Sequence, residues 1–253
     1  MNLSQNEVLM RGIKLTRKWG GLVAVNGVDI DLVKGQIHAV IGTNGAGKST
    51  LINLLSGEIP LSSGTVELLG QDVTQRSQPQ RANLGLGKSY QRNTIFAELS
   101  VLENCRLSAQ SRIQKPWNFW QDAQQCKESK SIALHTLEKT GLTKVIHRQA
   151  GLLSHGQKRQ LEVAMCLATQ PKVLLLDEPL AGMGADETER MLNFLIGLRP
   201  DHAIMLVEHD MDAVFRVADT ITVMVNGSVI ARGTPADVRS NPEVQSAYLG
   251  ESE

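Results

Sequence analysis

The chain has 253 residues, of which 42% are hydrophobic and 21% are charged, proportions that are ordinary for a folded protein and exclude extensive disorder. Its 26 basic and 26 acidic residues cancel, which excludes a protein drawn to nucleic acid or to an anionic membrane by its overall charge. No stretch approaches the roughly 20 apolar residues of a membrane-spanning helix and no secretory signal is visible, so we expect any membrane role to depend on other chains.

The first 42 residues predict three strands. The stretches VLMRGIKL, VNGVDIDL and QIHAVIG alternate between apolar and polar residues or run apolar, and they are rich in β-branched residues. Gly20-Gly21 and Lys34-Gly35 separate them, as expected for turns.

A phosphate-binding loop is predicted directly after the third strand. Gly42, four further residues, Gly47, Lys48 and Ser49 match the spacing of a P-loop, and the apolar pattern of a helix follows. The glycines allow backbone N–H groups to turn toward phosphates, and the helix N-terminus adds partial positive charge. Lys48 is expected to reach the β- and γ-phosphates, and Ser49 to offer its hydroxyl to Mg²⁺. The predicted nucleotide-binding residues here are Gly42, Thr43, Asn44, Gly45, Ala46, Gly47, Lys48, Ser49 and Thr50.

The stretch KVLLLDEP supplies the acidic partner that a P-loop site needs. Four apolar residues predict a buried strand that ends at Asp177 and Glu178 and is closed by Pro179. Asp177 fits the carboxylate on the metal side of such a site. Strand alternation puts Glu178 on the other side, where it fits the general base that holds the attacking water. An acidic pair after a strand is usually a solvated loop, but beside a P-loop it indicates hydrolysis.

Three further residues are candidates for the same site, each with an alternative. His209 follows a second apolar strand, at the edge of a sheet where residues commonly face a ligand, and a structural histidine is its alternative. Gln91 follows a short apolar stretch and, taken alone, is more readily interpreted as a surface glutamine. Trp19 fits a residue that stacks on adenine, a contact worth roughly 1 to 3 kcal/mol per base, or else a core or surface tryptophan.

A second helix start with the character of an anion site lies at LSHGQKRQLE, residues 153–162. Ser154 is a good N-cap, and Gly156 allows a phosphate to approach the backbone closely. One domain therefore has two helix starts suited to phosphate, and the second needs an explanation.

The motifs GTNGAGKST, Gln91, LSHGQKRQLE, VLLLDEP and EHD, in this order and spacing, resemble those of the nucleotide-binding subunits of ABC transporters over nearly the whole chain. LSHGQ is the specific element, because other P-loop ATPases, kinases and GTPases lack it. The resemblance implies an α/β fold, a P-loop ATPase core with an N-terminal antiparallel β subdomain and an inserted helical lobe. It implies one domain over residues 8–250, with the core at 8–97 and 168–250 and the lobe with the signature motif at 98–167.

The resemblance also explains the second helix start. In that family two such domains pack head to tail, and the signature motif of one completes the ATP site on the P-loop of the other. The implied ligands are ATP and Mg²⁺, and the implied catalytic residues are Glu178, His209 and Gln91, with Ser49, Gln91 and Asp177 around the metal. The residues implied to act in trans are Ser154, His155, Gly156 and Gln157.

The implied partners are a second ATPase subunit, either a copy of this chain or a paralogue, two membrane permease subunits and, indirectly, a substrate-binding protein, with no nucleic acid. The protein would then lie peripherally on the cytoplasmic face of the inner membrane, and Phe96 would belong to the dock for a permease helix. GGLVAVNGV, the hairpin signal Asn226-Gly227 and NPEVQSAYLGE look similar to bacterial importers of branched-chain amino acids. An importer of urea or amides, an exporter and a soluble non-transport ABC ATPase stay open, and a general P-loop kinase is weaker because it would not need LSHGQ.

Three positions depart from the pattern of that family. His155 stands where the signature commonly has glycine, and Thr43 stands where proline is frequent. Gly184 stands where the loop across the dimer usually has Asp or Asn. The last departure puts communication between subunits in doubt, and leaves ATP binding unaffected.

Overall fold

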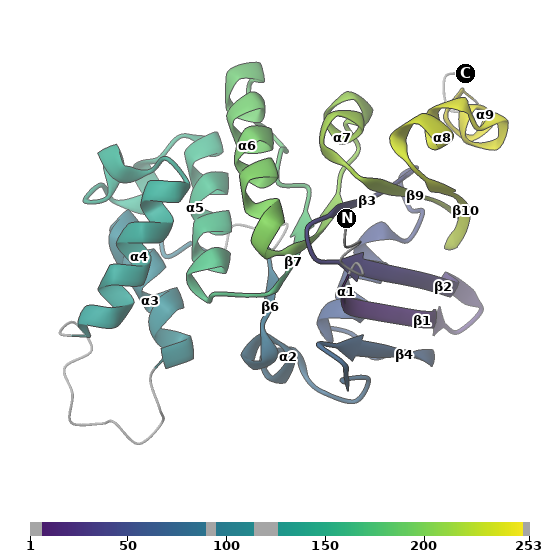
Figure 1. Cartoon of the computed structure of the whole chain (residues 1–253), viewed down its shortest axis with the longest axis horizontal. Helices are drawn as coiled ribbons and strands as arrows, with labels where there is room; N and C mark the ends of the chain where they lie inside the picture. The colour runs from purple at the N-terminus through teal and green to yellow at the C-terminus, as the bar shows by residue number, and fades with distance from the viewer. Residues whose placement is uncertain (1–6, 90–94, 114–125, 250–253) are drawn as a thin grey trace, which may run out of the picture. The chain divides into compact units, whose positions relative to one another are not determined.

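The computed structural model describes residues 7–89, 95–113 and 126–249 (Figure 1). The chain divides into two compact units. The core unit contains Met1–Lys88, Lys172–Glu178 and Ile196–Glu253, and the helical unit contains Ser89–Pro171 and Pro179–Leu195. The boundaries of these units differ from the expected lobe at 98–167, because the segment after Glu178 makes its contacts with the helices.

The core unit begins with a four-stranded antiparallel sheet in the order β2-β1-β4-β5. Its strands are β1 (Val8–Trp19), β2 (Leu22–Val33), β4 (Ser63–Leu68) and β5 (Gln71–Asp72). One face of the sheet carries Met10, Leu15, Ile30 and Leu32 into the main hydrophobic cluster, as the alternation in the sequence predicts. Four irregularities in the β1–β2 register interrupt this alternation.

A six-stranded sheet has the order β10-β9-β3-β8-β7-β6. Its strands are β3 (Ile37–Gly42), β6 (Leu86–Lys88), β7 (Val173–Asp177), β8 (Ala203–Val207), β9 (Thr220–Val225) and β10 (Ser228–Gly233). The five strands from β9 to β6 are parallel, and β3, β7 and β8 are buried throughout. β10 pairs antiparallel with β9 through Asn226 and Gly227, whose φ angles are 47° and 79°. Two positive φ angles are what a tight hairpin requires, so the predicted turn is confirmed.

The helices of the core unit are α1 (Lys48–Ser56), α2 (Gln78–Leu84), α7 (Met211–Val217), α8 (Pro235–Ser240) and α9 (Pro242–Leu249). The C-terminus of α1 is closed by Arg81, which is 2% exposed. Its Nη1 donates to the carbonyl oxygens of Leu54 and Leu55 at 2.9 and 2.7 Å. These carbonyls lie in the last turn of the helix, where that of Leu54 also accepts the N–H of Gly57 at 3.2 Å, and the guanidinium adds donors to them and counters the negative end of the dipole. Burial lowers the pKa of Arg81.

The helical unit contains α3 (Val101–Ile113), α4 (Lys127–Lys139), α5 (His155–Ala168) and the first eleven residues of α6 (Ala185–Leu198). A separate hydrophobic cluster holds α3, α4 and α5 together, with Val101, Cys105, Leu137, Leu161 and Ala164 at its centre. None of the helices in the described part of the chain has the length and apolar character that a bilayer crossing requires.

A buried histidine links the two sheets of the core unit. His38, on β3, is 5% exposed, with Nδ1 3.0 Å from the carbonyl oxygen of Asp31 and Nε2 2.8 Å from the hydroxyl of Thr222. A carbonyl can only accept, so Nδ1 must carry the proton of the neutral ring and Nε2 accepts from Thr222. Burial, together with the nearby charge of Arg232, lowers the pKa of His38 to about 4.

The first prediction concerns this histidine. The pKa of His38 is about 6.5 in the unfolded chain and about 4 in the folded protein. Between these two pH values the unfolded chain binds a proton and the folded protein does not, so the free energy of unfolding falls as the pH falls. The loss attributable to His38 amounts to about 3 kcal/mol. Urea unfolding at pH 7.5 and 4.5 should show a smaller loss for His38→Gln than for the wild type. Equal losses of unfolding free energy in the two proteins would contradict a lowered pKa of His38 as the cause.

Candidate functional site

The P-loop lies between the end of β3 and the start of α1, where two glycines meet the backbone of other strands. A Cβ atom at Gly47 would lie 2.3 Å from the carbonyl oxygen of Ala24, and φ at this position is 98°. A Cβ at Gly42 would lie 2.1 Å from the carbonyl oxygen of Met224. Both distances are far inside van der Waals contact, so only glycine fits at these two positions.

Hydrogen bonds from the β9–β10 hairpin hold the loop from outside. The N–H of Gly227 donates to the carbonyl of Ala46 at 3.0 Å, and the N–H of Asn26 donates to the carbonyl of Gly227 at 2.8 Å. Inside the loop, the N–H of Ala46 donates to the carbonyl of Thr43 at 3.1 Å. The C-terminal hairpin and β2 thus fix a loop that is distant from the hairpin in sequence.

The side chains of the P-loop differ in exposure. Lys48 is 8% exposed, and its ammonium donates to the carbonyl oxygens of Gly42 and Thr43 at 2.6 and 2.9 Å. Ser49 is exposed in the first turn of α1, and the N-cap residue Gly47 makes no side-chain hydrogen bond to that turn. The N–H groups of the turn have no partner within the helix and are therefore suited to an anion.

Asp177 and Glu178 follow β7, but only the first belongs to the strand. Asp177 is 4% exposed and lies opposite Val207 of β8. Glu178 has φ of 49°, and its N–H donates to the carbonyl of Val207 at 2.9 Å. The strand alternation that we used for Glu178 does not apply, because its left-handed backbone turns the chain out of the sheet. Its side chain is partly exposed, as access to water requires.

His209 follows β8 and is accompanied by a carboxylate that the sequence analysis missed. The side chain of His209 is 64% exposed, whereas Glu208 is 1% exposed. Oε2 of Glu208 accepts the N–H of His209 at 3.3 Å and lies 3.9 Å from its Nδ1. The sequence does contain a signal for Glu208, because this residue is a charged one directly after an apolar strand and next to a candidate histidine. Because β3, β8 and β7 are neighbours, the P-loop, His209 and the acidic pair all lie at the same edge of the parallel sheet.

Trp19 lies at the end of β1 and is 43% exposed, which excludes a place in the core. The guanidinium of Arg17 lies 4.8 Å from the centre of the indole ring, a cation–π contact. Arg17 was also missed, although residues two apart on a strand share a face. Gln91 lies outside the described residues.

The signature motif begins α5 in the helical unit. Oγ of Ser154 accepts the N–H of Gln157 at 3.2 Å, and Oε1 of Gln157 accepts the N–H of Ser154 at 3.2 Å, a reciprocal capping box. A Cβ at Gly156 would lie 2.3 Å from Oε2 of Glu187, so this carboxylate covers the glycine. The ring of His155 similarly lies against Gly182. Neither contact follows from the pattern of the sequence.

A P-loop after a buried strand, with acidic residues and a histidine at the ends of the neighbouring parallel strands, defines the class of P-loop nucleotide hydrolases. Two family models identify the chain further. The model described as ABC transporter matches residues 25–181, and the model described as branched-chain amino acid ATP-binding cassette transporter matches residues 228–253. The chain belongs to the ABC transporter family and is an ATPase of that family. The predicted fold class is confirmed.

Individual relatives agree with this assignment. The chain is 36% identical over 247 residues to the high-affinity branched-chain amino acid transport ATP-binding protein BraF of Pseudomonas aeruginosa, covering 94% of this chain and 96% of BraF. It is 38% identical, over an alignment of 260 residues, to the corresponding Escherichia coli protein, LivG, covering 99% of this chain and 98% of LivG. A crystal structure of the ADP conformation of an ATP-binding cassette of an ABC transporter superposes with a TM-score of 0.84 at 29% identity, covering 96% of this chain and 99% of that one.

The second prediction follows from the contact at Gly47. The Gly47→Ala substitution puts a Cβ against the carbonyl of Ala24 in a left-handed backbone, which costs about 1 to 3 kcal/mol and displaces the loop. ATP affinity, measured by titration calorimetry, should fall at least about tenfold. Gly197→Ala is the matched control, because no atom lies within 4 Å of its Cβ position. Unchanged ATP affinity in Gly47→Ala would show that the glycine is dispensable.

Proposed function

We propose that this chain is the ATP-hydrolysing motor subunit of a bacterial importer of branched-chain amino acids, and that it acts through separate membrane subunits. The observation that carries the proposal is the division of two phosphate-suited helix starts between two compact units. The P-loop and the acidic pair belong to the core unit, and the signature helix α5 belongs to the helical unit. The names of BraF and LivG support the class of cargo.

In this proposal the P-loop residues Asn44 to Thr50 hold the phosphates of ATP. Lys48 neutralises charge on the β- and γ-phosphates. The adenine ring stacks on Trp19, whose indole ring is kept in position by Arg17. Because the guanidinium covers one face of the ring, the base takes the other.

The residues at the sheet edge fit Mg²⁺. The hydroxyl of Ser49 and the carboxylate of Asp177 are hard oxygen donors, which Mg²⁺ prefers. Within the described ranges, three or more His, Cys, Asp or Glu side chains nowhere gather as a metal cage. Such a cage is not needed, because Mg²⁺ takes most of its ligands from phosphates and water. The resemblance adds Gln91 as a further ligand. When bound, the ion neutralises charge that develops on the phosphates.

Hydrolysis requires a base and a group that orients the γ-phosphate. Glu178 is partly exposed beside Asp177 and acts as the general base toward the attacking water. His209, exposed and flanked by the buried Glu208, contacts the γ-phosphate. Because phosphate oxygens accept and do not donate, His209 contacts them by donating a ring N–H, while the carboxylate of Glu208 lies 3.9 Å from Nδ1.

The signature residues Ser154, His155, Gly156 and Gln157 serve the ATP held by a second subunit, a copy of this chain or a paralogue. A site assembled in this way exists only while ATP bridges two subunits, so the binding energy drives a rigid-body closure that hydrolysis then releases. The absence of a side chain at Gly184 affects this communication and leaves nucleotide binding intact.

Two permease subunits receive the movement, and a substrate-binding protein delivers the cargo to them. The motor subunit is then held at the cytoplasmic face of the inner membrane by the permeases. Phe96, which is 54% exposed, is part of the surface on which a permease helix docks. A large apolar side chain at this exposure is a suitable anchor for a helix.

The third prediction tests the shared site. Glu178→Gln removes the base, so it should keep ATP binding and lose about 10² to 10⁴ in turnover. Light scattering on this variant with Mg-ATP should then give the mass of a dimer, and without nucleotide the mass of a monomer. The double variant with Gly156→Asp is the control, because a carboxylate at the start of α5, added beside that of Glu187 on α6, would repel the phosphate of the partner and should prevent pairing.

If the variant binds ATP and stays monomeric, pairing with itself is wrong and a paralogue is needed. Full steady-state hydrolysis by Glu178→Gln would remove the residue from the role of base.

The fourth prediction tests the cargo. Cells that lack the gene should lose uptake of labelled leucine at micromolar concentration, and the wild-type gene should restore it while Glu178→Gln should not. Urea and acetamide uptake serve as comparators. Loss of urea or amide uptake with unchanged leucine uptake would replace branched-chain amino acids by those substrates.

A further inference from the structure

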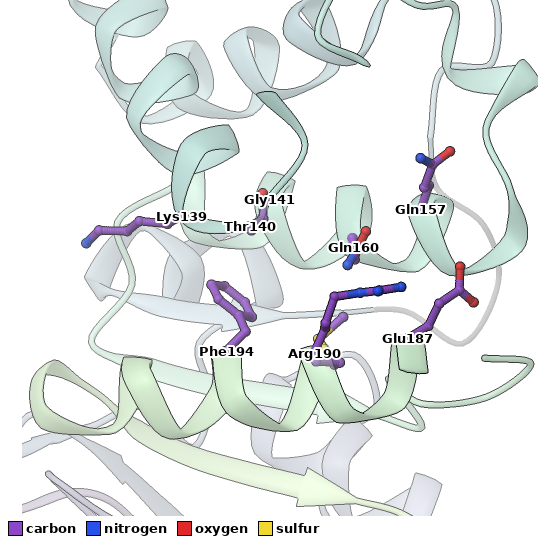
Figure 2. Close-up of a pocket in the computed structure, with 9 residues that line it drawn as sticks. Lys139, Thr140, Gly141, Gln157, Gln160, Glu187, Arg190 and Phe194 are labelled. Carbon is purple, nitrogen blue, oxygen red and sulfur yellow. The ribbon is translucent and has the colours of Figure 1, made fainter. Parts of the chain in front are cut away.

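The helical unit contains a cavity of about 310 Å³ whose lining includes no residue of the P-loop and neither Asp177 nor Glu178 (Figure 2). One wall is α6, another is the first half of α5, and the C-terminal end of α4 closes it. The volume is at the lower end of the range for ligand sites, which suits a small molecule better than a nucleotide. Of the residues that line it, Gln157 alone has a role proposed above, as part of the signature motif.

The wall formed by α6 presents three kinds of chemistry in order. Glu187, Arg190 and Phe194 are three and four residues apart, so they share one face of the helix, with the buried Met191 beside them. At 1.5 Å per residue, the carboxylate and the guanidinium start about 4.5 Å apart along the axis, and the phenyl ring follows about 6 Å further. The face therefore runs from acid to base to apolar surface.

The two charges on this face are not neutralised by each other. Within the described residues, Glu187 and Arg190 form no ion pair, and Arg190 makes no hydrogen bond. In the described part of the chain, Glu187 accepts one hydrogen bond, from the N–H of Gly184, at a long 3.4 Å. Opposite charges that line one cavity without meeting leave each free to pair with a ligand that carries both.

The facing wall, from α5, is polar and uncharged where it lines the cavity. Gln157 and Gln160 line the cavity from α5, and Figure 2 shows Gln160 opposite Arg190. Amide groups both donate and accept, so they suit either end of a zwitterion. Lys139, at the end of α4, is exposed, and in Figure 2 its side chain extends away from Arg190 and Glu187.

We propose that this cavity binds a free α-amino acid with an apolar side chain. Its ammonium pairs with Glu187, its carboxylate pairs with Arg190, and its side chain lies against Met191 and Phe194. A peptide lacks adjacent ammonium and carboxylate groups, and an apolar acid or amine satisfies only one of the two charges. The order of groups along α6 thus selects both the backbone and the side-chain class of the ligand.

A ligand in the cavity also affects the signature motif, a consequence that rests on the proposed function. Gln157 belongs to the capping box of α5, and the carboxylate of Glu187 covers Gly156. An amino acid between α5 and α6 restrains both groups. The motor would then sense the free concentration of its own class of cargo.

Titration calorimetry with the full-length chain tests the site. L-leucine should bind with a Kd between about 10 µM and 1 mM, a range normal for a ligand of this size. 4-Methylpentanoate, which lacks the ammonium, isoamylamine, which lacks the carboxylate, and L-aspartate, which lacks the apolar side chain, should each bind at least about tenfold more weakly. Arg190→Gln should weaken leucine binding at least about tenfold, and Phe194→Ala should weaken leucine more than alanine.

ATP is titrated into each protein in parallel. Unchanged ATP affinity in Arg190→Gln shows that the core unit is folded, and an unchanged far-UV circular dichroism spectrum and thermal transition show the same for the helical unit, which contains Arg190. No heat from leucine up to about 10 mM, in a protein that binds ATP and pairs as Glu178→Gln, would overturn the amino-acid site and leave the motor function standing. Equal binding of leucine by Arg190→Gln would overturn the site as well.

Discussion

The close contact of backbone with backbone around the P-loop is the constraint on which the core unit depends. Gly47 meets the carbonyl of Ala24, Gly42 meets that of Met224, and Gly227 donates to the loop at Ala46. These contacts join the N-terminal antiparallel sheet, the parallel sheet and the C-terminal hairpin at one point. Because no side chain separates the segments, the direction of α1 is set by main-chain geometry. The strands that bring Asp177 and His209 to the same edge are positioned by the same sheet.

The two helix starts suited to anions are built differently. The N-cap of α1 is a glycine that makes no side-chain hydrogen bond, so the first N–H groups of that helix are left for a ligand. At α5 the capping box already uses the N–H groups of Ser154 and Gln157. The first helix is therefore the stronger phosphate site, and the second contributes fewer donors. This difference agrees with an ATP site in which the P-loop of one subunit supplies most of the phosphate contacts and the signature motif of a second subunit supplies the rest.

The sequence predicted what depends on local pattern and missed what depends on side chains meeting from distant segments. The first three strands, the P-loop, the buried strand before Asp177 and the hairpin at Asn226 and Gly227 follow from periodicity and from residues with special backbone freedom. The left-handed backbone of Glu178 could not be foreseen, because glutamate has no preference for it. The contacts of Glu187 with Gly156, and of His155 with Gly182, depend on the packing of α5 against the start of α6. The unit boundaries differ for the same reason, since contacts and not composition group residues 179–195 with the helices.

Arg81 joins α1 to the segment that precedes α2 through four carbonyl oxygens, those of Leu54, Leu55, Thr74 and Arg76. Every one of these acceptors belongs to the main chain, so the link places no demand on the side chains of the residues it contacts. The link itself thus does not restrict the residue type at those four positions, where Leu54 and Leu55 are restricted instead by their burial in the main hydrophobic cluster. Arginine itself has no such freedom, because the compact ammonium of lysine lacks the planar, forked donors that reach acceptors on several sides at once. The demand that this link makes on the sequence therefore falls on one side chain, Arg81.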